Sequence, residues 1–269
     1  MTVDFHSHTR ESDGALSPAE LVARMRARGV AIFSITDHDT VRAYDGLTVE
    51  GAELVNGIEI NTTWNGDDVH VLGYGFPLGD DTPVAHTLAS NRAHRRDRVA
   101  RMVAGLNAAG YPIAVEDVLA ASGGGHTLGR PHVAKALIAG GYVPDVETAF
   151  RDLLTQGKPG YQPSPHVTPH EAVDVIARSG GVPVLAHPGR LKDESILDEL
   201  VDAGLAGLEV FYATHSRAQT AHFRKRAAHY GLVMSAGADF HDPRWSTHGV
   251  GMEIDQGDIT PFLEAVRHD

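Results

Sequence analysis

The chain has 269 residues, of which 42% are hydrophobic and 22% are charged, and it carries a net charge of −12 and no cysteine. This length and composition predict a globular protein with one large domain, or one domain with an insertion. The lack of cysteine excludes disulfides and thiolate metal sites, and the acidic balance argues against a protein that tracks long nucleic acid. The sequence has no apolar run of membrane-spanning length and no signal-type N-terminus, so we expect a cytoplasmic protein with no membrane partner.

The first candidate site lies at the N-terminus. Residues 2–5 predict a short strand that ends in His6-Ser-His8, and a turn with Asp13 follows. Side chains alternate across a strand, so His6 and His8 project from the same side and can reach one cation. Imidazole and carboxylate ligands suit zinc, manganese or iron better than calcium. The pattern therefore predicts a transition-metal site, with a pair of ordinary surface histidines as the alternative.

A helix and a second strand follow this site. The capping box at 17–20 predicts a helix that ends at Gly29. The apolar run at 30–36 predicts a buried parallel strand, which brings His38 to its carboxyl end. A ligand-type residue thus again follows a strand.

The next two predicted strands carry a glutamate and a histidine among apolar neighbours. Glu59 lies in the strand at 54–60 and His70 in the strand at 68–74. A buried glutamate is rare unless it is paired or binds a cation, which favours Glu59 as a ligand. His70 alone could be an ordinary core histidine, but its closeness to Glu59 in the sequence favours a ligand here too.

Residues 81–165 predict helices and loops with no clear strand. The helix predicted at 91–109 has an apolar stripe made of Val99, Val103 and Leu106. Arg92 and Arg96 extend this stripe towards the amino end, so we expect them to point inward at an anion. We expect the other three arginines to be solvated: Arg95, Arg98 and Arg101. The alternative is an ordinary charged helix face.

A glycine-rich loop in the same segment leads into a helix. The stretch 122–129, which includes His126, precedes Arg130-Pro131-His132. The free N–H groups and the positive dipole end of a helix start bind anions, and Arg130 adds a bidentate guanidinium. We interpret this helix start as a phosphate clamp.

Alternating strands and helices resume in the last third of the chain. The strand predicted at 182–186 ends in His187. The strand at 207–212 carries Glu209, which could be a buried structural acid, and His215 beyond its end could contact a ligand.

The last predicted strand, at 232–236, leads to Asp239 and His241, which repeat the spacing of the N-terminal histidine pair. Most of the candidate ligands follow strands that alternate with helices, and barrels of parallel strands place their active sites at these strand ends. Nine nitrogen and oxygen ligands exceed the needs of one ion and suit two or three. The nine are His6, His8, Asp13, His38, Glu59, His70, His187, Asp239 and His241.

This set resembles the PHP family, named for polymerase and histidinol phosphatase. The motifs that carry the resemblance are Asp4-Phe-His6-Ser-His8, Ser12-Asp13-Gly14, Thr36-Asp37-His38, Gly57-Ile-Glu59, Ala186-His187-Pro188 and Asp239-Phe-His241. The stretches 69–74 and 129–132 make the chain most similar to the bacterial nucleoside 3′,5′-bisphosphate phosphatases and 5′-to-3′ exonucleases of short RNA. The resemblance implies an α/β fold: a distorted (β/α)7 barrel formed by 1–80 and 166–269, with 81–165 as a helical insertion that caps the substrate.

The resemblance also implies a centre of two or three divalent metal ions, with manganese expected and iron or zinc as alternatives. One ion would take His6, His8 and Asp239. It would share Glu59 with a second ion, which is held by His70 and His187. A third ion would take Asp13, His38 and His241. Many family members have a histidine in place of Asp13, so the identity of the third metal stays open.

The expected reaction is hydrolysis of a nucleotide phosphomonoester by a hydroxide that bridges the metal ions. Expected substrates are a small phosphorylated nucleotide, such as a 3′,5′-bisphosphate, or a short oligonucleotide trimmed from its 5′ end. The residues expected at the reacting centre are Asp239, His241 and His187. The residues expected to bind substrate are Arg92, Arg96, Arg130, His132 and His215.

Other readings of the sequence stay open. A phosphatase for a small non-nucleotide ester such as histidinol phosphate would not need the arginine-bearing insertion. A processive exonuclease is disfavoured by the acidic charge, and a metal-binding module without catalysis or an amide hydrolase is also possible. The sequence does not predict an oligomeric state.

Overall fold

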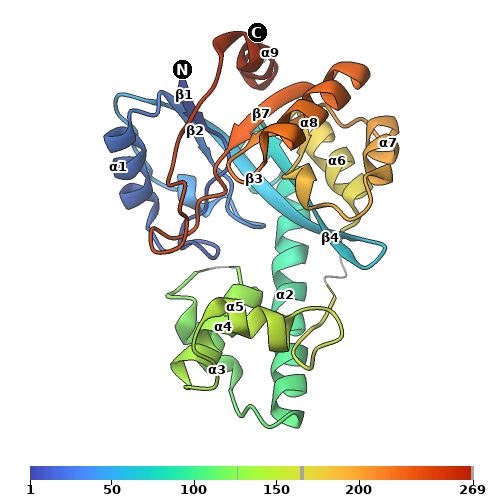
Figure 1. Cartoon of the computed structure of the whole chain (residues 1–269). Helices are drawn as coiled ribbons and strands as arrows, with labels where there is room; N and C mark the ends of the chain where they lie inside the picture. Colours follow the sequence, from blue (N-terminus) through green and yellow to red (C-terminus); the bar gives the residue numbers. More distant parts are fainter. Residues whose placement is uncertain (126, 164–166, 268–269) are drawn as a thin grey trace.

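The computed structural model describes residues 1–125, 127–163 and 167–267. Its strands form one sheet, in the order β7-β6-β5-β4-β3-β2-β1-β8, which curls into a nearly closed barrel (Figure 1). The Phe5 and His8 N–H groups donate to the carbonyls of Ala236 and Phe240, which joins the end of β1 to the end of β7. The strands are β1 (Thr2–Asp4), β2 (Ile32–Ile35), β3 (Glu53–Trp64), β4 (Asp67–Tyr74), β5 (Val182–Leu185), β6 (Gly207–Tyr212), β7 (Val233–Gly237) and β8 (Met252–Glu253).

The β3–β4 hairpin is the main distortion of the barrel. β1, β2 and β3 are parallel to one another, as are β5, β6 and β7, whereas β4 runs antiparallel to both of its neighbours. The first half of β4 therefore lies at the rim where the parallel strands end. This places His70 opposite Asn61, two residues beyond Glu59 on β3. The strands at Glu59 and His70 were predicted correctly, and their side chains reach the rim from within a hairpin.

Helices cover the outside of the barrel. The capping boxes predicted at Ser17 and Thr168 are confirmed: each hydroxyl accepts a backbone N–H three residues later. The last helix and β8 were not predicted. The helices are α1 (Pro18–Arg28), α6 (Pro169–Arg178), α7 (Ser195–Asp202), α8 (Arg217–Tyr230) and α9 (Gln256–Arg267), with 3₁₀ turns η1 (Arg42–Tyr44) and η3 (Pro188–Arg190).

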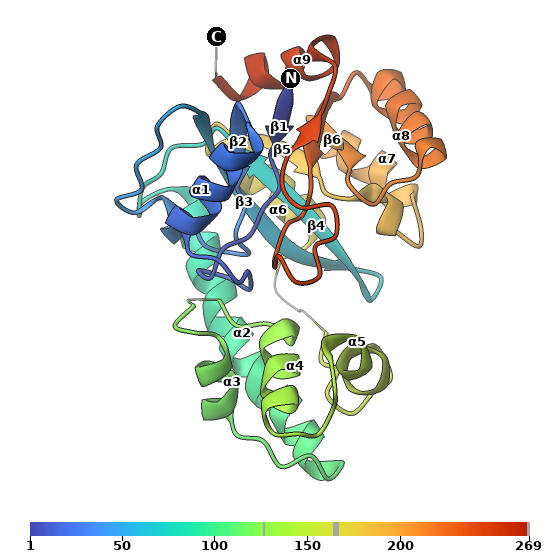
Figure 2. The same cartoon turned by 60° about the vertical axis from the view of Figure 1, so that its left-hand side comes forward.

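Between β4 and α6 the described residues form helices and turns only. These are α2 (Pro83–Ala108), α3 (Val115–Ala121), α4 (Arg130–Ala139), α5 (Val146–Ala149) and the π-helical turn η2 (Phe150–Leu154). Figures 1 and 2 show α2 as a long helix that leaves the barrel and carries α3–α5 at the end opposite to the N-terminus. Val84 and Leu88 of α2 pack in the barrel core, whereas Val99 and Leu106 pack in a separate core with α3 and α4. His126 and the predicted boundary at 165/166 lie outside the described residues.

The buried face of α2 differs from the predicted one. Leu88, Arg95 and Met102, which are seven residues apart and so lie on one face of the helix, are buried. Arg98 is buried beside them. Arg96, which we expected to point inward, is exposed. Our stripe was centred on the insertion core alone, but the same helix also packs on the barrel, which turns the buried face towards Arg95 and Arg98. The predictions that Arg95 and Arg98 are solvated and that Arg96 faces inward are therefore wrong.

Buried Asp4 stabilises the junction between β1 and the segment that follows β7. Asp4 accepts hydrogen bonds from the backbone N–H groups of His6, Ala238 and Gly251. Burial raises its pKa to about 6, although these three donors favour the ionised form. Asp4 thus holds together the backbone segments that carry His6 and Asp239.

No helix in the described part of the chain is long and apolar enough to cross a membrane.

Candidate metal centre and active site

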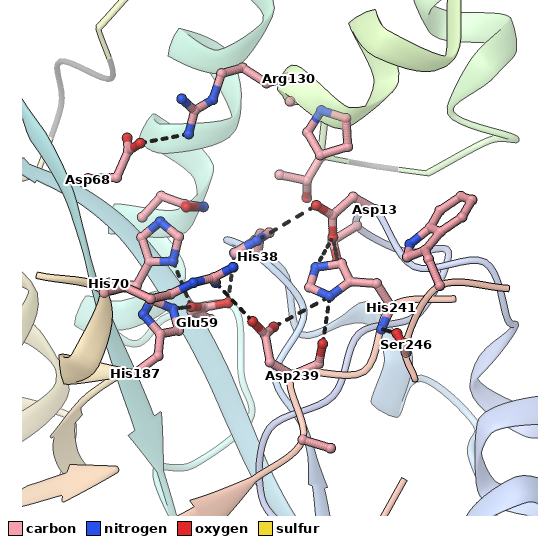
Figure 3. A pocket seen from close by; sticks show the side chains of 18 of the residues that line it. Asp13, His38, Glu59, Asp68, His70, Arg130, His187, Asp239, His241 and Ser246 are labelled. Atoms are coloured by element: carbon pink, nitrogen blue, oxygen red, sulfur yellow. Dashed lines mark hydrogen bonds and ion pairs between the residues drawn. The ribbon is translucent and has the colours of Figure 1, made fainter. Parts of the chain in front are cut away.

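The predicted ligands meet in one pocket of about 390 Å³ between the barrel rim and the helical insertion (Figure 3). His6 and His8 are fully buried beneath it. Most of the ligands follow the carboxyl ends of β1, β2, β5 and β7, as predicted. The other seven predicted ligands line the pocket: Asp13, His38, Glu59, His70, His187, Asp239 and His241.

The first group of ligands joins both ends of the chain. His6 Nε2 lies 3.2 Å from a Glu59 oxygen and 3.4 Å from an Asp239 oxygen. His8 Nε2 lies 3.1 and 3.2 Å from the same two oxygens. These four atoms converge on one point and could hold one cation.

Glu59 also belongs to a second group. Its other oxygen lies 2.7 Å from His70 Nδ1 and 3.2 Å from His187 Nε2. His38 Nδ1 also lies 3.1 Å from Glu59. One ligand atom each of His38, Glu59 and His70 is close enough to the other two for the three to share a cation. Glu59 therefore contacts histidines of both groups, one group through each oxygen of its carboxylate.

A third group surrounds Asp13. Its carboxylate lies 3.3 Å from His241 Nε2 and 3.8 Å from both His8 and His38. His241 Nδ1 donates to the Asp239 carbonyl, which leaves Nε2 to face Asp13. The structure thus brings together Asp13, His38 and His241, as predicted, and adds His8 beside them.

Several buried atoms in these groups have no hydrogen-bond partner. Among the described residues, these include His6 Nε2, both ring nitrogens of His8, His38 Nδ1 and one Glu59 oxygen. Buried polar atoms are nearly always paired, because an unpaired one costs free energy. Lone pairs that converge in this way are satisfied by a cation. Imidazole and carboxylate donors match divalent transition metals, so the residues present fit such ions.

The electrostatics of the pocket also call for positive charge. Burial would raise the pKa of Glu59, but the histidines His38, His6 and His70 hold it well below its usual range. Asp13 and Asp239 keep low pKa values in the same way, against their burial. Burial opposes protonation of His8, but Asp239 and Glu59 outweigh it and raise the pKa to about 10. These three carboxylates thus stay ionised and attract protons or metal ions to the histidines.

A buried glutamate behind the ligands orients two of them. Glu209 is fully buried, and one of its oxygens accepts from His6 Nδ1 at 2.9 Å. Its other oxygen accepts from the His187 backbone N–H at 2.6 Å. The bond to Nδ1 turns His6 Nε2 towards the metal position, which is the usual role of a carboxylate behind a ligating histidine. The structural role expected for Glu209 is confirmed, but its ligand partners could not be read from the sequence.

Two further contacts fix the acidic ligands. Asp37 accepts from the N–H and hydroxyl of Thr9 and from the Ser12 hydroxyl, which holds the turn that carries Asp13. The Tyr212 hydroxyl donates to Asp239 at 2.9 Å. No motif in the sequence points to this role of Tyr212.

Backbone strain is concentrated at the same rim. Four non-glycine residues among those described have positive φ, and three of them lie at this site: Asp39 (51°), His187 (28°) and Asp239 (52°). Such conformations are unfavourable for residues with a side chain and persist where the surrounding structure enforces them. The strained conformations of His187 and Asp239 orient their side chains towards Glu59 and His6.

The insertion supplies a cationic wall to the pocket. Arg95 donates to Asp39 at 2.6 Å and to the Leu128 carbonyl, and Arg98 donates to the Gln162 carbonyl. Both side chains are more than nine-tenths buried, both line the pocket, and each has one terminal nitrogen without a partner. Counting the buried spacing from Leu88, in the part of α2 that packs on the barrel, would have found both.

The predicted substrate-binding residues are placed differently from one another. Arg130 lines the pocket and pairs with Asp68 at 2.7 Å (Figure 3). Arg92 donates to the Asp39 carbonyl and faces, together with the exposed Arg96, a separate surface pocket. The structure therefore places Arg130 at the site, while Arg92 and Arg96 lie away from it.

The rings of His132, in the first turn of α4, and of His215, beyond β6, bond to nearby backbone. His132 lines the pocket, but its Nδ1 accepts the Gly129 N–H, and its ring also bonds to the Ser12 backbone. Burial lowers the pKa of His132 to about 4, so the ring is neutral. His215 accepts the Gly189 N–H and donates to the Val210 carbonyl, and it does not line the pocket. Both rings use their nitrogens to fix backbone next to the site.

Known proteins resemble the chain over nearly its whole length. A 3′,5′-nucleoside bisphosphate phosphatase from Chromobacterium violaceum is 34% identical over 93% of this chain and 90% of its own. A 5′-3′ exoribonuclease from Haemophilus influenzae is 32% identical over 93% of this chain and 94% of its own. A phosphoribosyl 1,2-cyclic phosphate 1,2-diphosphodiesterase from Eggerthella lenta is 31% identical over 94% of this chain and 99% of its own. No protein-family model matches the sequence.

Solved structures share the fold. A putative metal-dependent phosphoesterase from Bifidobacterium adolescentis has a TM-score of 0.87 at 32% identity, over 99% of this chain and 96% of its own. A protein from C. violaceum, described as an amidohydrolase with bound sulfate and no metal, has a TM-score of 0.86 at 32% identity, over 98% of this chain and 96% of its own. The relatives, the barrel and its cluster of histidines and carboxylates agree: the chain belongs to the PHP family of metal-dependent phosphoesterases, in the branch of the nucleoside bisphosphate phosphatases and 5′-3′ exoribonucleases.

Proposed function

We propose that the chain hydrolyses phosphomonoesters of nucleotides, with 3′,5′-nucleoside bisphosphates as its main substrate class. The observation that carries this proposal is the pairing of two sites in one pocket. A cluster of metal-ligand type lies at the barrel rim, and the buried guanidinium groups of Arg95 and Arg98 face the same pocket from α2. A substrate with two phosphates, one for each site, fits this arrangement. The C. violaceum relative, a 3′,5′-nucleoside bisphosphate phosphatase, supports it.

We assign the cations to the predicted ligand groups. His6, His8 and Asp239 would hold one ion, which shares Glu59 with a second ion at His70 and His187. Asp13, His38 and His241 would hold a third. We propose two or three ions, with manganese as the native metal and iron or zinc as alternatives. When bound, such ions acidify water and neutralise charge on phosphoryl oxygens.

The chain's own residues position the reacting phosphate. We propose that Asp239, His187 and His241 surround the scissile group, since all three line the pocket. Tyr212 and the strained backbone hold the Asp239 carboxylate in place. The helical insertion covers the pocket and limits access of bulk water to the reacting phosphorus.

The second phosphate would bind at the cationic wall. Burial, with Arg130 and Arg95 close by, lowers the pKa of Arg98 to about 10, so it is still charged at neutral pH. Like charges brought together out of water favour a bound anion between them. Guanidinium groups match the geometry of phosphate oxygens. The bound sulfate of the C. violaceum neighbour supports an anion site in this fold.

The test compares adenosine 3′,5′-bisphosphate with adenosine monophosphate as substrates of manganese-loaded protein. Arg98→Met and Arg130→Ala should each lower kcat/KM for the bisphosphate by about 10- to 100-fold, the cost of a lost charge-assisted hydrogen bond. The loss for the monophosphate should be several-fold smaller. Arg101→Ala, on the exposed face of the same helix, is the control and should change neither value.

Equal losses on both substrates would remove the second-phosphate role of these arginines. If a panel that includes histidinol phosphate showed a non-nucleotide ester as the better substrate, the proposed substrate class would be wrong.

A second candidate function is the trimming of short RNA from its 5′ end. A further pocket of about 530 Å³ adjoins the first and shares His70, His187 and Arg130 with it. This space could take the next nucleotide of a short strand, and the exoribonuclease relative supports the idea. A short 5′-phosphorylated oligoribonucleotide in the same assay tests it, with release of 5′ mononucleotides as the expected result.

A further inference from the structure

The loop after His241 carries an unusually exposed tryptophan. Trp245 exposes 47% of its surface, more than any other large hydrophobic residue exposed in the described part of the chain. It also lines the active-site pocket, which the other four such residues do not. Trp245 is therefore a large aromatic ring within reach of a ligand in this pocket.

The loop holds this ring in a fixed position. Asp242 is buried and accepts hydrogen bonds from the Arg244 backbone N–H and from its guanidinium. The guanidinium of Arg244 lies 4.7 Å from the centre of the Trp245 ring. The Ser246 hydroxyl accepts from the N–H groups of His241 and Asp242. Arg244 therefore packs on the indole from one side, and the metal-ligand segment anchors the loop.

The loop that carries Trp245 lies across the pocket from Arg130, the first residue of α4. Figure 3 shows Arg130 with Asp68 on one side of the pocket, and His241 with Ser246 on the other. In a nucleoside bisphosphate the base and the two phosphates leave the ribose in three different directions. The pocket offers a matching surface for each: the ligand cluster, the arginine wall and the indole of Trp245.

We propose that Trp245 stacks on the nucleobase of the substrate and thereby selects nucleotides over phosphate esters that lack a base. This inference rests on the proposed function and names the part of the site that reads the base. Stacking on an aromatic ring is available to every base, because each has a π face. The enzyme should therefore require a base but discriminate little between adenine, guanine, cytosine and uracil.

The kinetic test uses adenosine 3′,5′-bisphosphate and 1,4-anhydroribitol 3,5-bisphosphate, which keeps the ribose 2-hydroxyl and has no base. Trp245→Ala should lower the ratio of kcat/KM between these two substrates by about 5- to 150-fold, the range measured for loss of one base-stacking contact. Trp245→Phe should retain most of the ratio, since phenylalanine keeps an aromatic face. Trp64→Phe is the matched control and should leave the ratio as it is, because Trp64 does not line the active-site pocket and a bisphosphate has no further nucleotide to enter the adjoining one.

A binding test uses tryptophan fluorescence, because the chain has two tryptophans only. In Trp64→Phe the signal comes from Trp245, and adenosine 3′,5′-bisphosphate should quench it on mixing with zinc-loaded protein. The base-free analogue should not quench. In Trp245→Phe the signal comes from Trp64, and neither compound should quench it.

The outcomes separate the two proposals. An unchanged ratio in Trp245→Ala, or quenching of Trp64 and not of Trp245, would overturn the stacking role while bisphosphate hydrolysis stood. If the wild-type protein hydrolysed neither compound, the proposed function would fail, and quenching of Trp245 by the nucleotide alone would still support base stacking.

Discussion

Replacing Glu59 with glutamine is expected to lower kcat/KM on the order of 10³-fold or more and to reduce the metal content of the protein. Glu59 is 1% exposed and contacts histidines of two ligand groups, so its charge serves both. Glutamine keeps the size of the side chain and removes the negative charge that draws cations to these histidines. Elemental analysis and phosphate release from adenosine 3′,5′-bisphosphate measure the two effects.

The matched control is Glu53→Gln on the same strand. Glu53 is exposed and pairs with Arg267 at the far end of β3, so activity and metal content should stay at the wild-type level. If Glu59→Gln kept both full activity and full metal content, Glu59 would not bridge the centre.

Replacing Asp39 with asparagine is expected to lower the free energy of unfolding by about 3–5 kcal/mol, the usual cost of leaving one member of a buried ion pair alone. Asp39 is 1% exposed and accepts from Arg95 at 2.6 Å and from Asn91 at 3.0 Å. These bonds tie α2 to the barrel at the residue after His38. Asparagine tolerates the positive φ of this position, so the change isolates the loss of charge. Urea denaturation followed by circular dichroism measures it.

A double variant tests whether the ion pair is the cause. Asp39→Asn combined with Arg95→Met removes both charges and should be more stable than Asp39→Asn alone. If the free energy of unfolding of the double variant fell by the sum of the losses in Asp39→Asn and Arg95→Met, the Asp39–Arg95 pair would not be the source of the destabilisation.

The barrel and the ligands could be predicted because their signals are local. His38, His187 and Asp239 each follow an apolar strand by two or three residues, so the strand and the ligand can be recognised in one short stretch of sequence. The capping boxes at Ser17 and Thr168 mark helix starts in the same way. Two predicted groups, around Asp239 and around Asp13, are brought together in the structure, while His38 also approaches Glu59 and His70.

Features that depend on contacts between distant segments were missed. The buried face of α2 depends on packing in both the barrel core and the insertion core. The apolar stripe at Val99, Val103 and Leu106 reflects the insertion core alone, so it wrongly predicts that Arg96 is buried and Arg95 is solvated. Glu209 orients His6 from 203 residues away, which no local pattern reveals. His132 at a helix start and His215 beyond a strand end are both predicted to bind substrate, but their ring nitrogens bond to nearby backbone.

The most direct test of the metal centre is elemental analysis of the protein purified without chelators. The convergence of buried, unpartnered histidine and carboxylate atoms predicts stoichiometric divalent transition metal. The proposed function adds the expectation of two or three equivalents per chain, with manganese the most abundant. A preparation that is active on nucleotide phosphates yet contains no stoichiometric transition metal would contradict the account.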